Sequence, residues 1–457
     1  MMAGHGERRR LTFVPVGGPK LPSTAMPTHY CVVCPVCGWR APDDGTVLVC
    51  PGVHEPALLQ ADYQGAPFTT DDDQSGLYRY RRWLPIRRQL PGATTTQVYQ
   101  STRLGRFLGL RRLWVAFSGH WPERSCEMET GTFKDLEASI VLSRLPDDCP
   151  ALVVPSAGNT AAAFAALASK HRVPCVVVIP ARGLRKIVLR RSLASWVKVI
   201  ALEEADYADA ITFAETLCRE LGGVLEGGTK NIARRAGLST VFLAAMEKLE
   251  RMPDFYFQGV GSGAGAIAVH EAARRWSGAQ TGSTAPLPRL PRLMLCQNAE
   301  LAPLYDSWRR EAYGAETPGD EVLGYEATSR CFADELTNRF PPYAVRGGVR
   351  DCLIESRGDM CVADGPAAGE ASQLFRRLEG IDIEPAAAVA VACLEQAVAT
   401  RRVAADDLVL LNITGGGRQK LAQESDLSPA TSVRYVPSHE WGASLASASL
   451  VRACTSS

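Results

Sequence analysis

Short apolar runs alternate with helix-like stretches along the sequence, and this alternation constrains the fold more than any other feature. Each run is apolar throughout rather than at every second residue, so both faces of the sheet should be covered, as in parallel sheets. We therefore expect an α/β fold, with helices at 160–170 and 207–221 and a surface loop at 277–291. The expected strands are residues 152–155, 175–179, 197–202, 255–259, 292–297 and 408–413.

Length and charge limit the classes of protein that fit this sequence. A chain of 457 residues predicts two or three domains. Its 50 basic and 49 acidic residues nearly cancel, which gives no electrostatic reason for a nucleic-acid or membrane partner. No apolar run approaches the roughly 20 residues of a membrane helix. The first residues lack the apolar core of a signal peptide, so we expect a cytoplasmic protein.

The cysteines fall into two groups. Most of the 14 are isolated in apolar stretches, as Cys175 and Cys296 are, which is typical of reduced residues in a core. Cys34, Cys37, Cys50 and His54, by contrast, have the spacing of a Cys₃His zinc knuckle, with Cys31 as an alternative to His54. A redox-active Cys34–Cys37 pair and a knuckle without metal remain open as alternatives.

Three further segments have chemical meaning. Lys134 follows a Gly/Thr turn and begins an expected helix, whose first amides could hold an anion; a lone lysine is otherwise a surface residue. Residues 155–160 lie between an expected strand and helix, where N–H groups and hydroxyls can bind a carboxylate or simply cap the helix. Four glycines within 259–265 suit a phosphate-binding loop. No acidic residue follows at the distance that a dinucleotide site requires.

In this order, the segments resemble the fold type II family of pyridoxal-phosphate enzymes, which has a tryptophan synthase β-like fold and includes threonine synthase and the cysteine synthases. Thr132-Phe133-Lys134 resembles its Ser-Phe-Lys pattern, which implies that Lys134 is catalytic and carries pyridoxal 5′-phosphate as a Schiff base. A fourth match, at 412–417, implies that Thr414 faces the pyridine nitrogen. The implied cofactor-binding residues are Lys134, Asn159, Gly261, Ser262, Gly263, Ala264, Gly265 and Thr414. The implied substrate-binding residues are Thr132, Ser156, Ala157, Gly158, Asn159 and Thr160.

Longer motifs at 117–123 and 133–138 depart from threonine synthase and, together with a motif at 334–343, resemble the cysteate synthase family. That resemblance implies replacement of the phosphate of O-phospho-L-serine by sulfite, which gives L-cysteate. Lys134 would move the α-proton as a general base. Three alternatives remain: threonine synthase acting on O-phosphohomoserine with water, a phosphoserine enzyme that uses an amine or sulfide, and a non-catalytic pyridoxal-phosphate-binding protein.

Two anionic reactants require cationic side chains near the site. The candidates by neighbourhood are Arg124, Arg182, Arg185, Lys186 and Arg339, for each of which a surface role is an equal alternative. His120 is a candidate polar wall residue or a structural histidine. A homodimer or a higher homo-oligomer is the expected assembly, since dimers are the commonest default among oligomers.

The resemblance also implies two α/β domains with the cofactor in the cleft between them. The larger, phosphate-binding domain would comprise 66–100 and 225–440. The smaller domain, at 101–224, would carry Lys134 and the carboxylate loop. A Cys-rich zinc-knuckle-like segment at 27–65 would precede them, between a flexible tail at 1–26 and, at the other end of the chain, a tail at 441–457.

Overall fold

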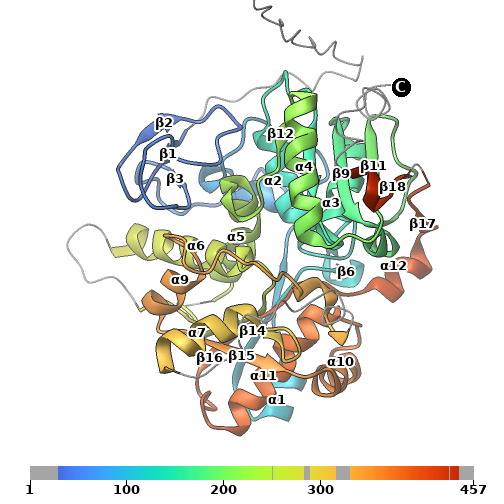
Figure 1. Ribbon diagram of the computed structural model, residues 1–457. Coiled ribbons are helices and arrows are strands. Elements are labelled where there is room, and N and C mark those ends of the chain that lie inside the picture. Colours follow the sequence, from blue (N-terminus) through green and yellow to red (C-terminus); the bar gives the residue numbers. More distant parts are fainter. Residues whose placement is uncertain (1–28, 250, 282–288, 315–329, 432, 442–457) are drawn as a thin grey trace, which may run out of the picture.

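Two sheets and a small N-terminal unit organise the protein, a computed structural model of which describes residues 29–249, 251–281, 289–314, 330–431 and 433–441. One sheet has six strands and the other has five, and a three-stranded unit lies beside them (Figure 1). The expected tails at 1–26 and 441–457 lie outside the described residues, apart from Trp441.

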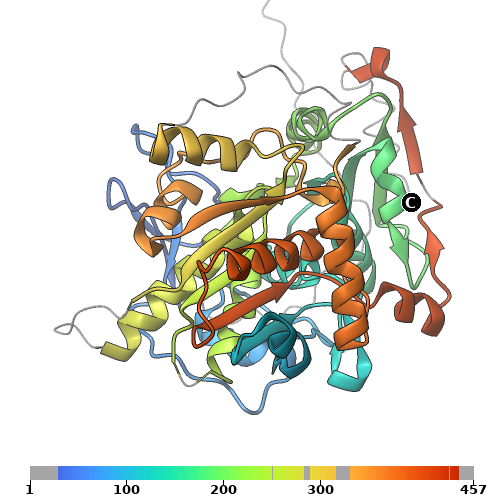
Figure 2. The ribbon, with the colours of Figure 1, turned by 90° about the horizontal axis from the view of Figure 1, so that it is seen from below.

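The six-stranded sheet has the order β15-β14-β13-β16-β5-β4 and is parallel except for its edge strand β4 (Figure 2). Helix α11, Pro385–Ala399, packs on its central strands, and α5, Ile232–Met246, packs against β4 and β5. Its strands are β4 Gln97–Gln100, β5 Arg112–Phe117, β13 Phe255–Gly259, β14 Arg292–Asn298, β15 Asp359–Ala363 and β16 Leu408–Ile413.

The five-stranded sheet, in the order β12-β8-β9-β11-β18, is parallel throughout. Helices α3, Asn159–His171, and α4, Tyr207–Leu221, pack on it. A capping box between Asp206 and Asp209 fixes the start of α4. The strands are β8 Leu152–Pro155, β9 Cys175–Pro180, β11 Val197–Leu202, β12 Val224–Leu225 and β18 Val433–Val436.

Two of the remaining α-helices, α2 and α6, begin at residues of the expected site. The remaining α-helices in the described residues are α1 Thr102–Leu108, α2 Lys134–Arg144, α6 Ala264–Thr281, α7 Pro303–Tyr313, α9 Val349–Ser356, α10 Gly365–Glu379 and α12 Arg418–Glu424. Two small antiparallel pairs join β6 His120–Trp121 to β7 Cys126–Glu127, and β10 Val188–Leu189 to β17 Ser428–Pro429.

Each of the six expected strands is present, because a fully apolar run fits a strand that is covered on both faces. Sheet membership differs from the expected domain division in two places. Strand β5 lies within 101–224 but belongs to the six-stranded sheet, and β18 lies beyond 224 but pairs with β11. Parallel sheets insert strands out of chain order through crossover connections, so a division by contiguous segments cannot locate them.

The expected surface loop at 277–291 is wrong in its first part. Helix α6 continues to Thr281, and β14 begins at Arg292. Residues 282–288 lie outside the described part. Ser277 is buried, so the helix keeps contact with the protein there and extends through the Ser/Gly-rich start of the segment.

The N-terminal unit, which we call the knuckle, is a sheet of β1 Cys31–Val33, β2 Arg40–Pro42 and β3 Gln60–Asp62. Its small core packs against Ile232 at the start of α5. Behind the knuckle, Asp43 and Arg144 form a buried ion pair in which Arg144 Nη2 lies 2.6 Å from Asp43 Oδ1. The knuckle is therefore fixed to α2, the helix that begins at Lys134.

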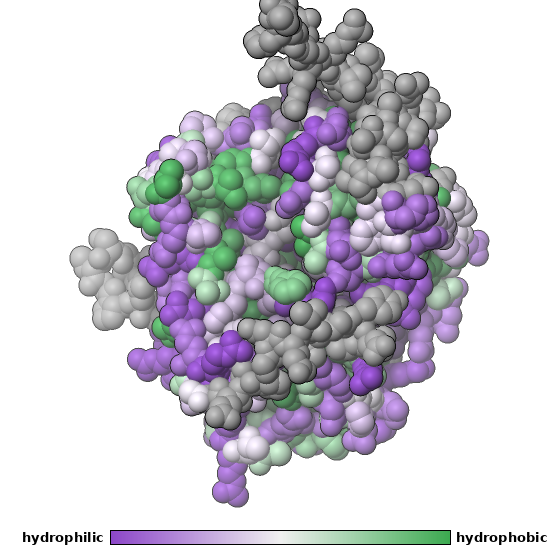
Figure 3. Space-filling view, viewed as in Figure 1, coloured by the Kyte–Doolittle hydropathy of each residue, from purple (hydrophilic) through white to green (hydrophobic). Residues whose placement is uncertain are grey.

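Hydrophobic residues on the face shown in Figure 3 gather mainly over the knuckle, whereas much of the remaining face is hydrophilic. Val36, Val49 and Val53 are among the large hydrophobic side chains that the knuckle exposes. Of the helices in the described residues, none has the length and apolar character that crossing a bilayer requires.

Candidate active site

A rigid turn presents Lys134 at the first position of α2. Gly131 has φ of +69°, a conformation that favours glycine. Asp135 accepts hydrogen bonds from the N–H of Thr130 (3.0 Å) and from its hydroxyl (2.6 Å), and Phe133 N–H donates to Thr414 O (2.8 Å). The turn that precedes Lys134 is thus tied directly to the backbone of Thr414.

A cavity of about 120 Å³ lies in front of this turn and is lined from both sheets. Every residue expected to bind cofactor or substrate lines this cavity except Thr132 and Gly263. Thr132 is buried behind Lys134, and its hydroxyl accepts a bond from Lys134 N–H (3.3 Å). Gly263 has φ of +79°, and a Cβ there would lie 2.2 Å from Val349, so it shapes the glycine loop from behind.

The glycine loop fits a phosphate group. It follows the end of β13 and leads into α6, so the free amides of the helix N-terminus face the cavity. Within the described structure, no hydrogen bond occupies the backbone N–H of Gly261, Ser262 or Gly263. A Cβ at Gly265 would lie 2.4 Å from Gln258, so a larger residue does not fit there. These features suit the phosphate of pyridoxal phosphate.

The loop at 156–160 is equally well defined. Ser156 Oγ accepts hydrogen bonds from the N–H groups of Gly158 (3.2 Å) and Ala161 (2.9 Å), which holds the loop at the start of α3. Asn159 donates to Glu384 Oε2 (2.8 Å) and accepts from Arg418 (3.0 Å). Its amide is therefore fixed at the wall of the cavity.

Thr414 lies across the cavity from this loop, after the end of β16. Among the described residues, its hydroxyl has no hydrogen-bond partner. A free, neutral hydroxyl suits the pyridine nitrogen of pyridoxal phosphate, because it can form a hydrogen bond without supplying a full positive charge.

Three charged residues next to Lys134 were missing from the sequence-based site. Glu137 lies 3.2 Å from Lys134 Nζ, and Arg234 joins Glu137 (3.0 Å) to Glu226 (2.6 Å). Two signals could have indicated them. Glu137 is three residues after Lys134 and so lies on the same helix face. Arg234 interrupts an otherwise apolar helix, where a charged residue requires a buried partner.

Glu384 is a further wall residue that the sequence analysis missed. It is buried, contacts Asn159 Nδ2, and has Oε1 2.6 Å from Arg418. Burial raises the pKa of its carboxyl to about 7, against the lowering effect of the Arg418 guanidinium. Glu384 is therefore a buried carboxyl at the edge of the cavity, paired with Arg418 and Asn159.

The cationic candidates divide by position. Lys186 lines the cavity and is ion-paired with Asp334 and Glu335, which lie on the other side of it. Arg185 pairs with Asp334 and is largely exposed. Arg124 instead stacks on aromatic rings, with its guanidinium carbon 3.9 Å from the Tyr99 ring centroid.

His120 lines neither this cavity nor the one beside it. It is buried between Glu424, 2.7 Å from Nε2, and Arg190, 3.0 Å from Nδ1. These contacts fit the structural alternative for His120 rather than a polar wall of the site.

A second, larger cavity of about 500 Å³ adjoins the first, with Tyr207, Arg234 and Ser262 in both walls. It contains Arg182 and Arg339 from the cationic candidates, and Arg339 pairs with Asp206. Leu48 and Val49 of the knuckle form part of its wall. Reactants that enter through this cavity would pass a surface that is mainly apolar but has several cations.

Known proteins with similar sequences and folds were compared with this chain. Residues 90–415 match the family described as "Pyridoxal-phosphate dependent enzyme". Cysteate synthase of Methanospirillum hungatei is 39% identical over 85% of this chain and 90% of that protein. Cysteate synthase of Methanoculleus marisnigri is 41% identical over 88% and 92%. Maize serine racemase aligns with a TM-score of 0.52 at 19% identity, over 72% of this chain and 93% of that one, and shows the shared fold alone.

The chain therefore belongs to the pyridoxal-phosphate-dependent enzymes, and the α/β fold expected from the resemblance is confirmed. Within that family, its relatives place it in the cysteate synthase group, which confirms the narrower resemblance as well. The protein is an enzyme, and its family uses pyridoxal phosphate as cofactor.

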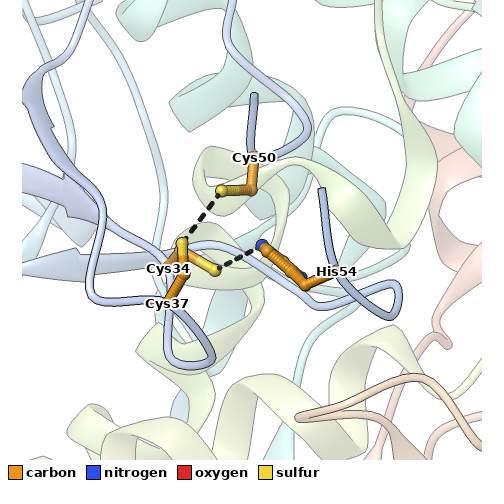
Figure 4. Close-up of side chains that lie close together, drawn as sticks. All are labelled: Cys34, Cys37, Cys50 and His54. Carbon is orange, nitrogen blue, oxygen red and sulfur yellow. Dashed lines mark hydrogen bonds between the residues drawn. The ribbon is translucent and has the colours of Figure 1, made fainter. Parts of the chain in front are cut away.

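The knuckle brings together the expected metal ligands. The ligand atoms of Cys34, Cys37, Cys50 and His54 all lie within 4.8 Å of one another (Figure 4). Cys34 Sγ is 3.3 Å from His54 Nε2, and Cys37 Sγ is 3.5 Å from Cys50 Sγ, so the set can hold a tetrahedral zinc ion. Cys31, the alternative ligand, is not in the cluster because it lies on β1, paired with Pro42 and Asp62.

We expect the purified protein to contain about one zinc per chain, since three thiolates and an imidazole form a closed structural site. Cys37→Ser should lower the zinc content to near zero, as measured by elemental analysis. Cys31→Ser is the matched control and should keep the metal. Equal zinc content in the two variants would contradict the assignment of the ligands.

Proposed function

We propose that the protein replaces the phosphate of O-phospho-L-serine by sulfite, which gives L-cysteate and inorganic phosphate. One observation carries this proposal. A single cavity joins Lys134, the 156–160 loop, the glycine loop and Thr414, in a chain whose relatives are cysteate synthases. The name of these relatives supplies the product, and the cavity supplies groups suited to each part of the reaction.

Each set of residues has its own task in this proposal. The amides at 261–265 hold the cofactor phosphate, and Asn159 and Thr414 contact its ring. Ser156 and Thr160, with the backbone between them, bind the substrate carboxylate through the start of α3. When bound, pyridoxal phosphate supplies an electron sink for negative charge at the substrate α-carbon.

Lys134 moves the proton. In its neutral form, the Nζ amine takes the α-proton of phosphoserine, and phosphate leaves the β-carbon with the bonding electron pair. Sulfite then donates a lone pair to the β-carbon, and the proton on Nζ returns to the α-carbon. Proton and charge balance without an oxidant or reductant. Lys186 is a cation on the cavity wall beside Gly158, but its charge is already paired with Asp334 and Glu335.

Product analysis tests the proposal. The holoenzyme is incubated with O-phosphoserine and, separately, sulfite, sulfide or an amine, and with O-phosphohomoserine in water. We expect cysteate and phosphate in the sulfite reaction, identified by mass. Turnover of phosphohomoserine to threonine, or reaction with another nucleophile in preference to sulfite, would refute this assignment of substrates.

A further inference from the structure

A buried carboxylate contacts the amine of Lys134. Glu137 is one helical turn after Lys134, its side chain is 0% exposed, and its Oε2 lies 3.2 Å from Nζ. Its other oxygen accepts hydrogen bonds from the Thr160 hydroxyl (2.7 Å) and from Arg234 (3.0 Å). A fully buried carboxylate is costly unless it is paired, so its contacts define its role.

The charges around Glu137 balance only when Lys134 is protonated. Arg234 donates to both oxygens of Glu226, at 2.7 and 2.6 Å, and to Glu137. Two buried carboxylates therefore face Arg234 and Lys134. With an ammonium at Lys134 the group is neutral, and with a neutral amine it has one excess negative charge. The net charge of this buried group therefore depends on whether Lys134 Nζ is protonated.

The same carboxylate also reaches the substrate loop. Thr160, which donates to Glu137, is the last residue of the 156–160 loop and lies in the first turn of α3. Glu137 therefore connects the amine that moves the proton with the loop proposed to bind the substrate carboxylate. Glu137 thus connects the two groups through one hydrogen bond of 3.2 Å to Lys134 and one of 2.7 Å to Thr160.

We propose that Glu137 is a positioning residue for the phosphate-replacement reaction, a role that rests on the proposed function: it aims the Lys134 amine and holds the ammonium while the α-proton resides there. The proton leaves the α-carbon, is carried on Nζ in a hydrogen bond to Glu137 Oε2, and returns to the α-carbon. Glu137 remains ionised throughout. No covalent bond is made or broken at Glu137; only its hydrogen bond to Lys134 Nζ forms and is released.

The pH response follows from the charged groups that face Lys134. Burial lowers the pKa of Lys134; the Glu137 carboxylate opposes this effect, and the Arg234 guanidinium adds to it. Glu226 also raises the pKa, through a weaker interaction. The other titratable groups in the wall of the same cavity are Tyr207, Lys186, Asp334, Glu335 and Glu384, of which Asp334 and Glu335 are ion-paired with Lys186. Removing the charge of Glu137 should therefore lower the pKa of Lys134 further.

The test measures how fast pyridoxal phosphate forms an imine with the cofactor-free, full-length chain across the neutral to alkaline range. Imine formation requires the neutral amine, so the midpoint of the rate profile reports the Lys134 pKa. In Glu137→Gln we expect the midpoint to fall by about one pH unit, which raises the rate about tenfold at pH values below it. The kcat for phosphoserine should fall, because the ammonium is no longer held.

Glu226→Gln is the matched control, since it breaks the same ionic group without touching Lys134. Its midpoint should move in the same direction by less than half as much. If both variants lose stability equally and keep the wild-type midpoint, Glu137 is only structural and the proposal is overturned. If Glu137→Gln does not fold, Glu137→Asp replaces it: an intermediate midpoint supports the proposal, and a wild-type midpoint overturns it.

This outcome can be separated from that of the proposed function. The midpoint is measured without substrate, so it stands whether or not sulfite proves to be the nucleophile. Absence of an imine in the wild-type chain would instead refute the proposed function itself. Lys134→Ala supplies the blank for the imine signal in every variant.

Discussion

Lys134→Ala is expected to abolish both the visible absorbance of the cofactor imine and the replacement reaction. The alanine variant lacks the amine that we propose bonds the cofactor and moves the α-proton, so kcat should fall by about 10³-fold or more. The fold should persist, because Lys134 is at the first position of α2 and its side chain is partly exposed to the cavity. Absorbance spectra and a phosphate-release assay measure the two losses.

Lys248→Ala is the control for this substitution. Lys248 is exposed beyond the end of α5 and lines neither cavity, so both spectrum and rate should match the wild type. Retention of the imine absorbance in Lys134→Ala would show that another lysine bonds the cofactor. Loss of absorbance with full activity would contradict the proposed chemistry even more directly.

Asp43→Ala is expected to have the largest effect on stability. Asp43 accepts hydrogen bonds from Arg144 Nε (2.8 Å) and Nη2 (2.6 Å) and from the Tyr30 hydroxyl (2.5 Å). Without Asp43, the buried Arg144 charge loses its ionic partner. Removing one member of a buried ion pair typically costs about 3–5 kcal/mol, so the free energy of unfolding in urea should fall by that amount.

The neighbouring residue provides the comparison. Asp44 is exposed and accepts only local bonds from the N–H groups of Thr46 and Val47, so Asp44→Ala should cost about 1 kcal/mol. In the double variant Asp43→Ala/Arg144→Met, no unpaired charge is left in the core, and part of the loss should be recovered. Equal stability losses in Asp43→Ala and Asp44→Ala would contradict a structural role for the buried pair.

Local sequence predicted the parts of this structure that depend on local chemistry. The strands were found because burial on both faces leaves a continuous apolar run, and the glycine loop because few other residues allow such a turn beside a phosphate. The clustering of the candidate knuckle ligands could be predicted because close spacing in sequence forces Cys34 and Cys37 to be close in space. The choice between Cys31 and His54 required the register of β1, which the spacing does not contain.

The remaining features depend on contacts between distant segments. Glu137 and Arg234 meet from two helices that are far apart in the sequence, and a charged residue read alone is assigned to the surface. Likewise, β5 and β18 join their sheets only through crossover connections. A buried charged residue can be predicted from sequence only when its ion-pair partner is known, and the fold determines which residue is the partner.

The position of Leu48 and Val49 has a consequence for how enzymes of this architecture can diversify. These two side chains wall the larger cavity, yet they belong to a unit with its own small core and its own candidate metal site. Substitutions there can reshape the approach to the proposed reaction centre while Lys134, the glycine loop and both sheets stay unchanged. Leu48 and Val49 are therefore positions at which substitution could alter the accepted nucleophile while the proposed catalytic residues stay the same.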